Sequence, residues 1–149
     1  MAEYPDRLKD TLADFDFVTT RSERAELLID IAGRFEPVPA RIATRPYAGE
    51  QRVPACESDA YVWSERQPNG TLKFHFAVEN PQGLSAQAMA VILDETLSGA
   101  PLEQVATVSP DIVLRIFGSE ISMGKGQGLM EMVRTVQRHA RSTLAEQAS

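Results

Sequence analysis

Side chains alternate between large apolar and smaller or polar types over residues 72–78. This period of two is typical of a strand that covers a core with one face. A partner strand is expected at about residues 58–65, and Asn69-Gly70 between the two favours a tight turn. The pattern therefore predicts one antiparallel hairpin near the middle of the chain.

Helical spacing of apolar residues, together with caps and helix breakers, predicts the other elements. The predicted helices have the approximate ranges 4–15, 22–33, 84–97, 102–105, 109–117 and 126–146. The helix at 84–97 is apolar on most sides, which indicates a central position, and Ser85 or a nearby residue is its candidate cap. The helix near residue 22 should be capped by Thr20 or Ser22. Its predicted apolar stripe consists of Ala25, Leu28, Ile29 and Ala32, and is widened by Leu27 and Ile31.

Two segments show neither the alternation of a strand nor the apolar spacing of a helix. Residues 36–55 form a long connection with four prolines, and residues 119–128 are expected to form a glycine-rich loop. Long loops inside compact domains are uncommon and often functional, so we expect the connection to be ordered. The glycines at 124, 126 and 128 resemble a phosphate-binding loop only superficially, because no strand precedes them. They should instead provide flexibility, or allow a close backbone approach to the segment that carries the cysteine.

Helices that flank one small antiparallel sheet indicate the α+β class, with the sheet packed against helices in two layers. The length of 149 residues is typical of a single domain, here residues 1–149. No apolar stretch approaches the ~20 residues that a membrane helix needs. The N-terminus lacks the pattern of a secretory signal, and we expect a cytoplasmic protein with no membrane partner.

Charge and metal-ligating residues exclude several function classes. The formal net charge is −6, which disfavours general binding to nucleic acids. One cysteine, Cys56, and two histidines, His75 and His139, cannot form an intrachain disulfide or a cysteine-rich zinc site. One thiolate is also too few for an iron–sulfur cluster held by this chain alone. We therefore expect no metal or cofactor, and structural or surface roles for both histidines.

Cys56 is the main candidate for chemistry. A lone cysteine is often a small buried hydrophobe. The position of Cys56 at the end of a proline-rich connection, just before a strand, favours access and function instead. The residues alone leave both interpretations open.

Residues 52–58 read Arg-Val-Pro-Ala-Cys-Glu-Ser, which resembles the motif R-V-x-G-C-x-S-x-V-W of the SufE family of cysteine-desulfuration accessory proteins. Residues 124–132 are similar to a second family stretch, S-R-S-Q-G-L-x-A-M, that precedes a helix. The predicted order of elements also agrees with the family. The resemblance covers essentially the whole chain.

The resemblance implies a SufE/IscU-like fold and a role in iron–sulfur cluster assembly. Cys56 would accept sulfur as a persulfide from a cysteine desulfurase of the SufS type, and the protein would activate that enzyme. It would then pass the sulfur to an iron–sulfur scaffold complex, acting as a carrier and not as an enzyme. Arg52, Ser58 and Lys125 are the predicted residues that bind the partner or support the thiolate. The protein should be a monomer or a homodimer.

The chain departs from the family pattern at four places. The acidic start of the central helix region is reduced to Glu79, with Pro81 where a second acid is common in the family. Ala55 replaces the glycine before the cysteine, and would be strained if that glycine has a positive φ. Tyr61 replaces the usual tryptophan, with Trp63 two residues further on the same strand face. Lys125 replaces an arginine, which keeps the charge but loses the planar fork.

A local basic group could favour the thiolate of Cys56. Arg41, Arg45 and Arg52 lie in the preceding connection, and Lys125 could approach from the glycine-rich segment. The arginines could equally be solvated at the surface or pair with Glu50 and Glu57, and the sequence leaves the choice open.

Three alternatives compete with a sulfur carrier. A cluster scaffold of the related fold needs more thiolates than this chain has. A thiol-dependent redox protein, such as a thiol peroxidase, needs a resolving thiol or a nearby base. An interaction module of the same fold would leave Cys56 inert.

Overall fold

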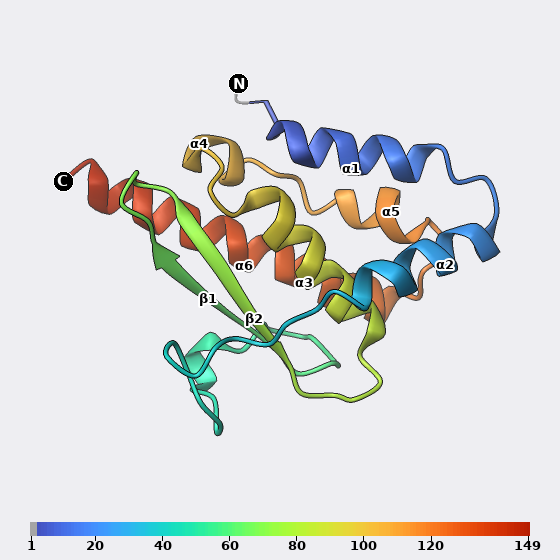
Figure 1. Ribbon diagram of the computed structural model, residues 1–149, viewed down its shortest axis with the longest axis horizontal. Helices are drawn as coiled ribbons and strands as arrows, with labels where there is room; N and C mark the ends of the chain where they lie inside the picture. Colours follow the sequence, from blue (N-terminus) through green and yellow to red (C-terminus); the bar gives the residue numbers. More distant parts are fainter. Residues whose placement is uncertain (1–2) are drawn as a thin grey trace.

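The computed structural model describes residues 3–149 as six α-helices, a short 3-10 helix and a two-stranded sheet (Figure 1). The prediction of an α+β fold with a small antiparallel sheet is confirmed. The elements follow in the order α1 (Asp6–Asp16), α2 (Arg21–Ala32), η1 (Gly49–Gln51), β1 (Ala60–Arg66), β2 (Leu72–Val78), α3 (Leu84–Leu97), α4 (Leu102–Val105), α5 (Ile112–Phe117) and α6 (Met123–Gln147).

The hairpin presents one face to the helices. Its register pairs Ala60 with Val78 and Arg66 with Leu72. α3 packs against β2 and α6 packs against β1, which buries Phe74 almost completely. Burial of one such side chain contributes ~1.5–3 kcal/mol. The alternation over residues 72–78 therefore reflects a strand that covers the core.

α3 lies at the centre of the molecule, as its uniformly apolar sequence predicts (Figure 1). It contacts α1, α2, α6 and β2, so that no side of the helix is left to water over most of its length. The N-cap is Gly83, which is near the predicted Ser85. The helix begins directly after Gly83, with no side-chain cap, and Ser85 lies in its first turn.

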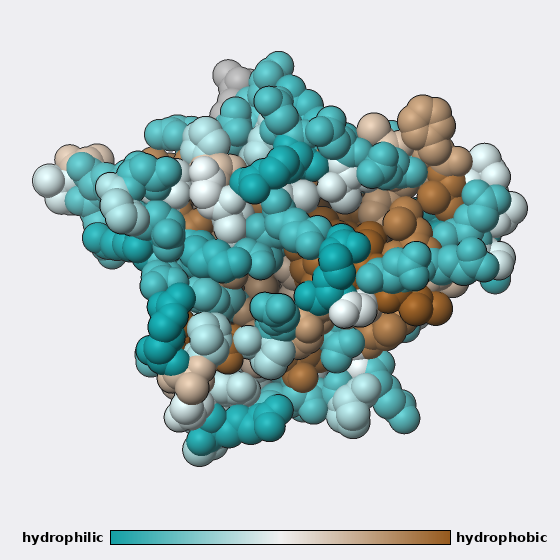
Figure 2. All heavy atoms as spheres, viewed as in Figure 1, coloured by the Kyte–Doolittle hydropathy of each residue, from teal (hydrophilic) through white to brown (hydrophobic). Residues whose placement is uncertain are grey.

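α2 lies at the margin, and its predicted apolar stripe is only partly correct. Thr20 caps the helix, because its hydroxyl accepts a hydrogen bond from the Glu23 N–H at 3.1 Å. The residues buried are Ile31 and Ala32, at the end that contacts α3, whereas 54% of Ile29 is exposed. Figure 2 shows hydrophobic residues gathered on the side of the molecule where α1 ends and α2 runs.

The prediction of a loop over residues 119–128 is correct for residues 119–122 and wrong for residues 123–128, which are helical. α6 begins at Met123, and the Ser122 hydroxyl caps it by accepting from the Lys125 N–H at 3.4 Å. Each glycine inside a helix costs about 0.8–1.0 kcal/mol relative to alanine. The packing of the rest of this 25-residue helix outweighs that cost. No helix within residues 3–149 combines the length and the apolar character required to cross a bilayer.

The opposite face of the hairpin is covered by the proline-rich connection. His75 lies on this face and is only 8% exposed, and its Nε2–H donates to Glu65 Oε1 at 2.9 Å. Arg41 donates two further hydrogen bonds to the Glu65 carboxylate, at 2.7 and 3.1 Å. On the core side, His139 Nδ1 hydrogen-bonds to Ser64 Oγ at 2.9 Å, and burial lowers the His139 pKa. Both histidines thus have structural contacts.

The Glu65 contacts predict a loss of stability in acid. Hydrogen bonds from Arg41, and then from His75, lower the Glu65 pKa from 4.5 to about 2. Because the folded-state pKa is the lower one, this stabilisation is present above about pH 4.5 and is lost as the pH falls towards 2. The difference in unfolding free energy between wild type and Glu65→Gln should therefore shrink over that window. Urea titrations at pH 6, 4 and 3 measure it, and a difference independent of pH would contradict the assignment.

Candidate functional site

Cys56 lies in a short loop between η1 and β1, here called the cysteine loop (residues 54–59). The loop is closed at its base, where the Val53 N–H donates to the Ala60 carbonyl at 2.8 Å and Arg52 forms an ion pair with Asp59. Within it, the Asp59 N–H donates to the Cys56 carbonyl at 3.2 Å. These contacts fix the cysteine at the tip of a tight turn at the start of the hairpin.

Ala55 has a φ of +57°, so the residue before the cysteine takes the left-handed conformation that favours glycine. The family motif has glycine here, and the chain keeps the loop shape with alanine. A left-handed conformation costs a residue with a β-carbon roughly 1–2 kcal/mol. The cysteine loop therefore carries local strain next to its reactive residue.

Ala55→Gly is expected to raise the free energy of unfolding slightly. It removes the left-handed penalty, while the greater freedom of glycine in the unfolded chain offsets roughly 0.4–1 kcal/mol of that gain. The net increase should be up to about 1 kcal/mol. Ala48→Gly is the matched control, because Ala48 is also an exposed loop alanine but has a φ of −63°. Urea unfolding should show Ala48→Gly to be destabilising, and equal losses in both variants would contradict the argument.

A cavity of about 170 Å³ opens beside Cys56. Three segments line it: the cysteine loop, residues 82–86 at the start of α3, and residues 124–129 in the first turns of α6. Cys56 is only 5% exposed and joins the edge of the hydrophobic core. We call this space the cysteine cavity.

The start of α6 lies directly against the cysteine loop. A β-carbon at Gly128 would lie 3.2 Å from both the Ala55 carbonyl oxygen and the Cys56 Cα. A β-carbon at Gly124 would lie 3.1 Å from a Glu57 carboxylate oxygen, so this acid sits at the N-terminal end of α6, which favours negative charge. The expectation of a close backbone approach is met, and glycine is what permits it.

The structure brings three of the four predicted site residues together. Cys56, Ser58 and Lys125 all line the cysteine cavity. Ser58 accepts a hydrogen bond from the Asn80 N–H through its backbone carbonyl, at 3.1 Å. The hydrogen bonds found within residues 3–149 do not include its hydroxyl.

Arg52 stands at the base of the loop and does not line the cavity. Its pKa is raised, chiefly by the hydrogen bond and the charge of Asp59, and to a smaller extent by the charge of Cys56. The side-chain hydrogen bond of this guanidinium goes to Asp59.

The predicted basic group is a series of separate ion pairs. Each arginine of the connection pairs with a carboxylate at the hairpin and does not face the thiol. The pairs are Arg41 with Glu65, Arg45 with Glu79, and Arg52 with Asp59. Lys125, by contrast, forms no ion pair within residues 3–149. It is the cation of the cysteine cavity.

Residues 82–86 contribute to the cavity and were not anticipated from the sequence. Gly83 allows the turn to pass close to the loop, because a β-carbon there would lie 2.7 Å from Val78 Cγ1 and 3.2 Å from Ser58 Cβ. Leu84, which is 43% exposed, lies at the same wall. The break in periodicity before α3 marked a turn, but gave no indication that this turn meets the cysteine.

Tyr61 and Trp63 share a face of β1, as predicted, with ring centroids 6.0 Å apart. Tyr47 packs against both, at 5.2 and 5.0 Å. This aromatic cluster fastens the proline-rich connection to the hairpin. It therefore stabilises the segment that leads into the cysteine loop.

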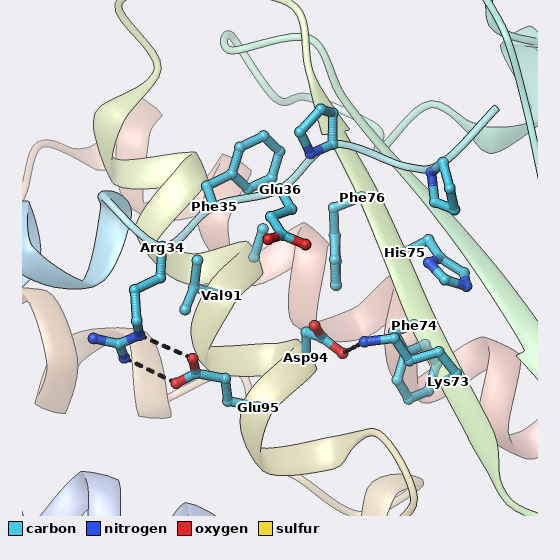
Figure 3. A pocket seen from close by; sticks show the side chains of 13 residues that line it. Arg34, Phe35, Glu36, Lys73, Phe74, His75, Phe76, Val91, Asp94 and Glu95 are labelled. Carbon is cyan, nitrogen blue, oxygen red and sulfur yellow. Dashed lines mark hydrogen bonds and ion pairs between the residues drawn. The ribbon is translucent and has the colours of Figure 1, made fainter.

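A second cavity, of about 220 Å³, lies between residues 34–39, β2 and α3 (Figure 3). Its charged side chains largely satisfy one another. Lys73 pairs with Asp94 at 2.6 Å, and Arg34 pairs with Glu95 at 2.9 Å. It contains no thiol, so the cysteine cavity remains the candidate site.

The chemistry of the cysteine cavity rests on one thiol. No group of three or more metal-ligating side chains is placed together within residues 3–149. A single sulfur nucleophile beside a lysine can accept and release one group by exchange. The arrangement suits transfer of a sulfur atom.

A sequence model of the SufE family, described as the Fe-S metabolism associated domain, matches residues 9–140. The chain belongs to the SufE family. The matched part of this SufE protein includes the whole cysteine cavity and most of α6. Iron–sulfur metabolism is therefore the setting in which its single thiol is to be interpreted.

The fold of this SufE protein matches a solution structure titled as a hypothetical protein from Thermus thermophilus. The TM-score is 0.73 at 24% sequence identity, over 95% of this chain and 98% of the other. That likeness concerns the fold alone. A search of curated proteins finds no significant match.

Proposed function

We propose that this SufE protein accepts sulfur on Cys56 from a cysteine desulfurase, stimulates that enzyme, and delivers the sulfur to an iron–sulfur scaffold complex. The observation that carries the proposal is the position of the only cysteine of a SufE-family chain, in a small cavity that also holds Lys125. On this proposal the protein is a carrier and activator, with no turnover of its own.

The transfer is an exchange of the thiol–disulfide type. The Cys56 thiolate attacks the outer sulfur of a persulfide on the desulfurase, and a new S–S bond forms at Cys56. The S–S bond of the donor breaks, and the donor cysteine leaves as a thiolate. One sulfur atom moves, no external oxidant or reductant is consumed, and protons exchange with solvent.

The burial of Cys56 supports a carrier that protects its persulfide from solvent. A side chain with 5% exposure is shielded from most thiols in solution, so a persulfide held there is protected between transfers. The same burial means that the partner has to open the cavity, or draw the loop out, before the two sulfur atoms can meet. A lone thiol stays reduced in a reducing compartment such as the cytoplasm. Cys56 would there remain available to accept sulfur.

The deciding experiment is mass spectrometry of the protein after incubation with a pyridoxal-dependent cysteine desulfurase and L-cysteine. The mass should rise by ~32 Da for each sulfur atom gained, and the increment should map to the peptide that contains Cys56. Dithiothreitol should remove it. A protein that stays at its original mass while the desulfurase is active would exclude the carrier function.

Lys125→Ala should slow persulfide formation about threefold or more at neutral pH, because an opposite charge beside a thiol favours the reactive thiolate. Lys125→Arg keeps the charge and should retain most of the rate. Arg52→Ala should have a smaller effect, since the Arg52 guanidinium is bound to Asp59. The measurement is the initial rate of sulfur uptake by Cys56.

Melting curves provide the control for these three variants. Lys125 is exposed and at the surface of α6, so its substitution should change stability within about 0.5 kcal/mol. Wild-type rates in both Lys125→Ala and Arg52→Ala would show that neither cation assists the thiol.

A further inference from the structure

A wide groove adjoins the cysteine cavity on the side of α2. It measures about 540 Å³ and runs between the start of α2, the segment 117–121 after α5, and the first turn of α6. Ser85 and Lys125 line both the groove and the cysteine cavity. The two hollows therefore adjoin each other, and we call the larger one the α2–α6 groove.

The α2–α6 groove is apolar at its floor. Leu28, Phe117 and Ile121 line it and are half-buried against the hydrophobic core. In the adjoining cysteine cavity, Leu84 is 43% exposed. Met123, the first residue of α6, is 80% exposed. Exposed apolar side chains close to a hollow are typical of a protein interface.

Its rim is basic, in a chain whose net charge is −6. Arg21, Arg24 and Lys125 line the groove with a single carboxylate, that of Glu120. Arg24 donates to the carbonyls of Arg115 and Ile116, at 3.0 and 2.7 Å, and forms no ion pair with a carboxylate among the described residues 3–149. This local field attracts an acidic partner surface.

Arg21 and Glu120 form an ion pair that joins the start of α2 to the segment after α5. Both side chains are well exposed, at 84% and 66%. An exposed ion pair contributes little stability, so a partner can displace it readily. A carboxylate from that partner would compete with Glu120 for Arg21.

We infer that the α2–α6 groove receives an acidic and apolar segment of the cysteine desulfurase. The inference rests on the proposed function, since a desulfurase that reaches Cys56 must cover the mouth of the cysteine cavity and hence the adjoining groove. Apolar side chains of the segment lie on the floor, and its carboxylates meet Arg21 and Lys125 at the rim. The groove thus supplies affinity, while the cysteine cavity supplies the chemistry.

Three variants of residues outside the cysteine cavity test the inference in binding assays with the purified desulfurase. Arg21→Glu reverses a rim charge and should weaken binding about tenfold. Ala25→Trp fills the groove from an exposed position on α2 and should weaken it by a similar factor. Glu120→Gln removes the competing carboxylate and should strengthen binding about threefold. The gain should disappear at high salt.

Matched controls separate the groove from general charge effects. Arg34→Glu and Glu95→Gln alter an exposed ion pair that lines the other cavity, and should leave the dissociation constant unchanged. The rate at which iodoacetamide labels Cys56 in the isolated protein should stay at the wild-type value in all of these variants. Melting curves should show each variant to be folded.

The outcomes distinguish the inference from the proposed function. Normal sulfur uptake by wild type, with unchanged affinity in the three groove variants, would overturn the inference alone. Weaker binding of Glu120→Gln would also overturn it, because the partner segment would then be basic. If the variants change self-association and not desulfurase binding, the inference is overturned and the groove serves a second copy of the chain. Failure of wild type to bind the desulfurase would overturn both.

Discussion

Cys56→Ser is expected to gain no sulfur from a cysteine desulfurase and to lose stimulation of that enzyme. The hydroxyl of serine does not ionise near neutral pH and cannot form a stable persulfide, so the exchange at residue 56 has no acceptor. Because the chain has no second cysteine, no other thiol can replace it. The expected effect is a complete loss, measured as the mass increment of the protein and the rate of alanine production by the desulfurase.

Cys56→Ala is the control for folding. Residue 56 is buried, and a serine hydroxyl without a partner there costs about 1–3 kcal/mol, whereas alanine mainly removes the sulfur atom. Both variants should still bind the desulfurase if the α2–α6 groove supplies affinity. Normal stimulation by folded Cys56→Ala would show that activation does not require sulfur transfer, and would favour an interaction module with an inert cysteine.

The sequence predicted the elements whose signal is local. The alternation over residues 72–78 identified the strand, and the uniformly apolar stretch at 84–97 identified the central helix. The motif around Cys56 located the cysteine loop, and the close approach expected of the glycines at 124–128 is present. For the strand and the central helix, periodicity determines the structure without knowledge of distant contacts.

The features that the sequence missed depend on tertiary packing. The apolar stripe in the sequence of α2 cannot show that this helix lies at the edge of the molecule, where Ile29 is exposed to water. Glycine content argued for a loop at 119–128, because helix propensity takes no account of a loop packed against the helix. The pairing of Arg41 and Arg45 follows from the position of the connection over the hairpin. Likewise, no local pattern indicates that residues 82–86 meet Cys56.

Gly128→Ala is expected to disturb the cysteine loop, whereas the same change at Gly126 should not. Alanine gains about 0.8–1.0 kcal/mol over glycine inside a helix at either position. At Gly126 the new methyl group makes an ordinary contact, 3.5 Å from Ile121 Cγ2, so that Gly126→Ala should be stabilising. At Gly128 it would lie 3.2 Å from backbone atoms of Ala55 and Cys56, which cannot rotate away. Overpacking of this kind typically costs ~1–3 kcal/mol, which cancels or exceeds the helical gain.

The consequence for function is a less protected thiol in Gly128→Ala. Displacement of the cysteine loop from α6 should open the cysteine cavity, and iodoacetamide should then label Cys56 several times faster than in wild type or in Gly126→Ala. Urea unfolding of the two variants gives the stability difference, and the labelling rate reports the position of the loop. If Gly128→Ala is as stable as Gly126→Ala and labels at the wild-type rate, contact with α6 does not shield the cysteine. The protection of Cys56 would then have to come from residues 82–86, on the opposite wall of the cavity.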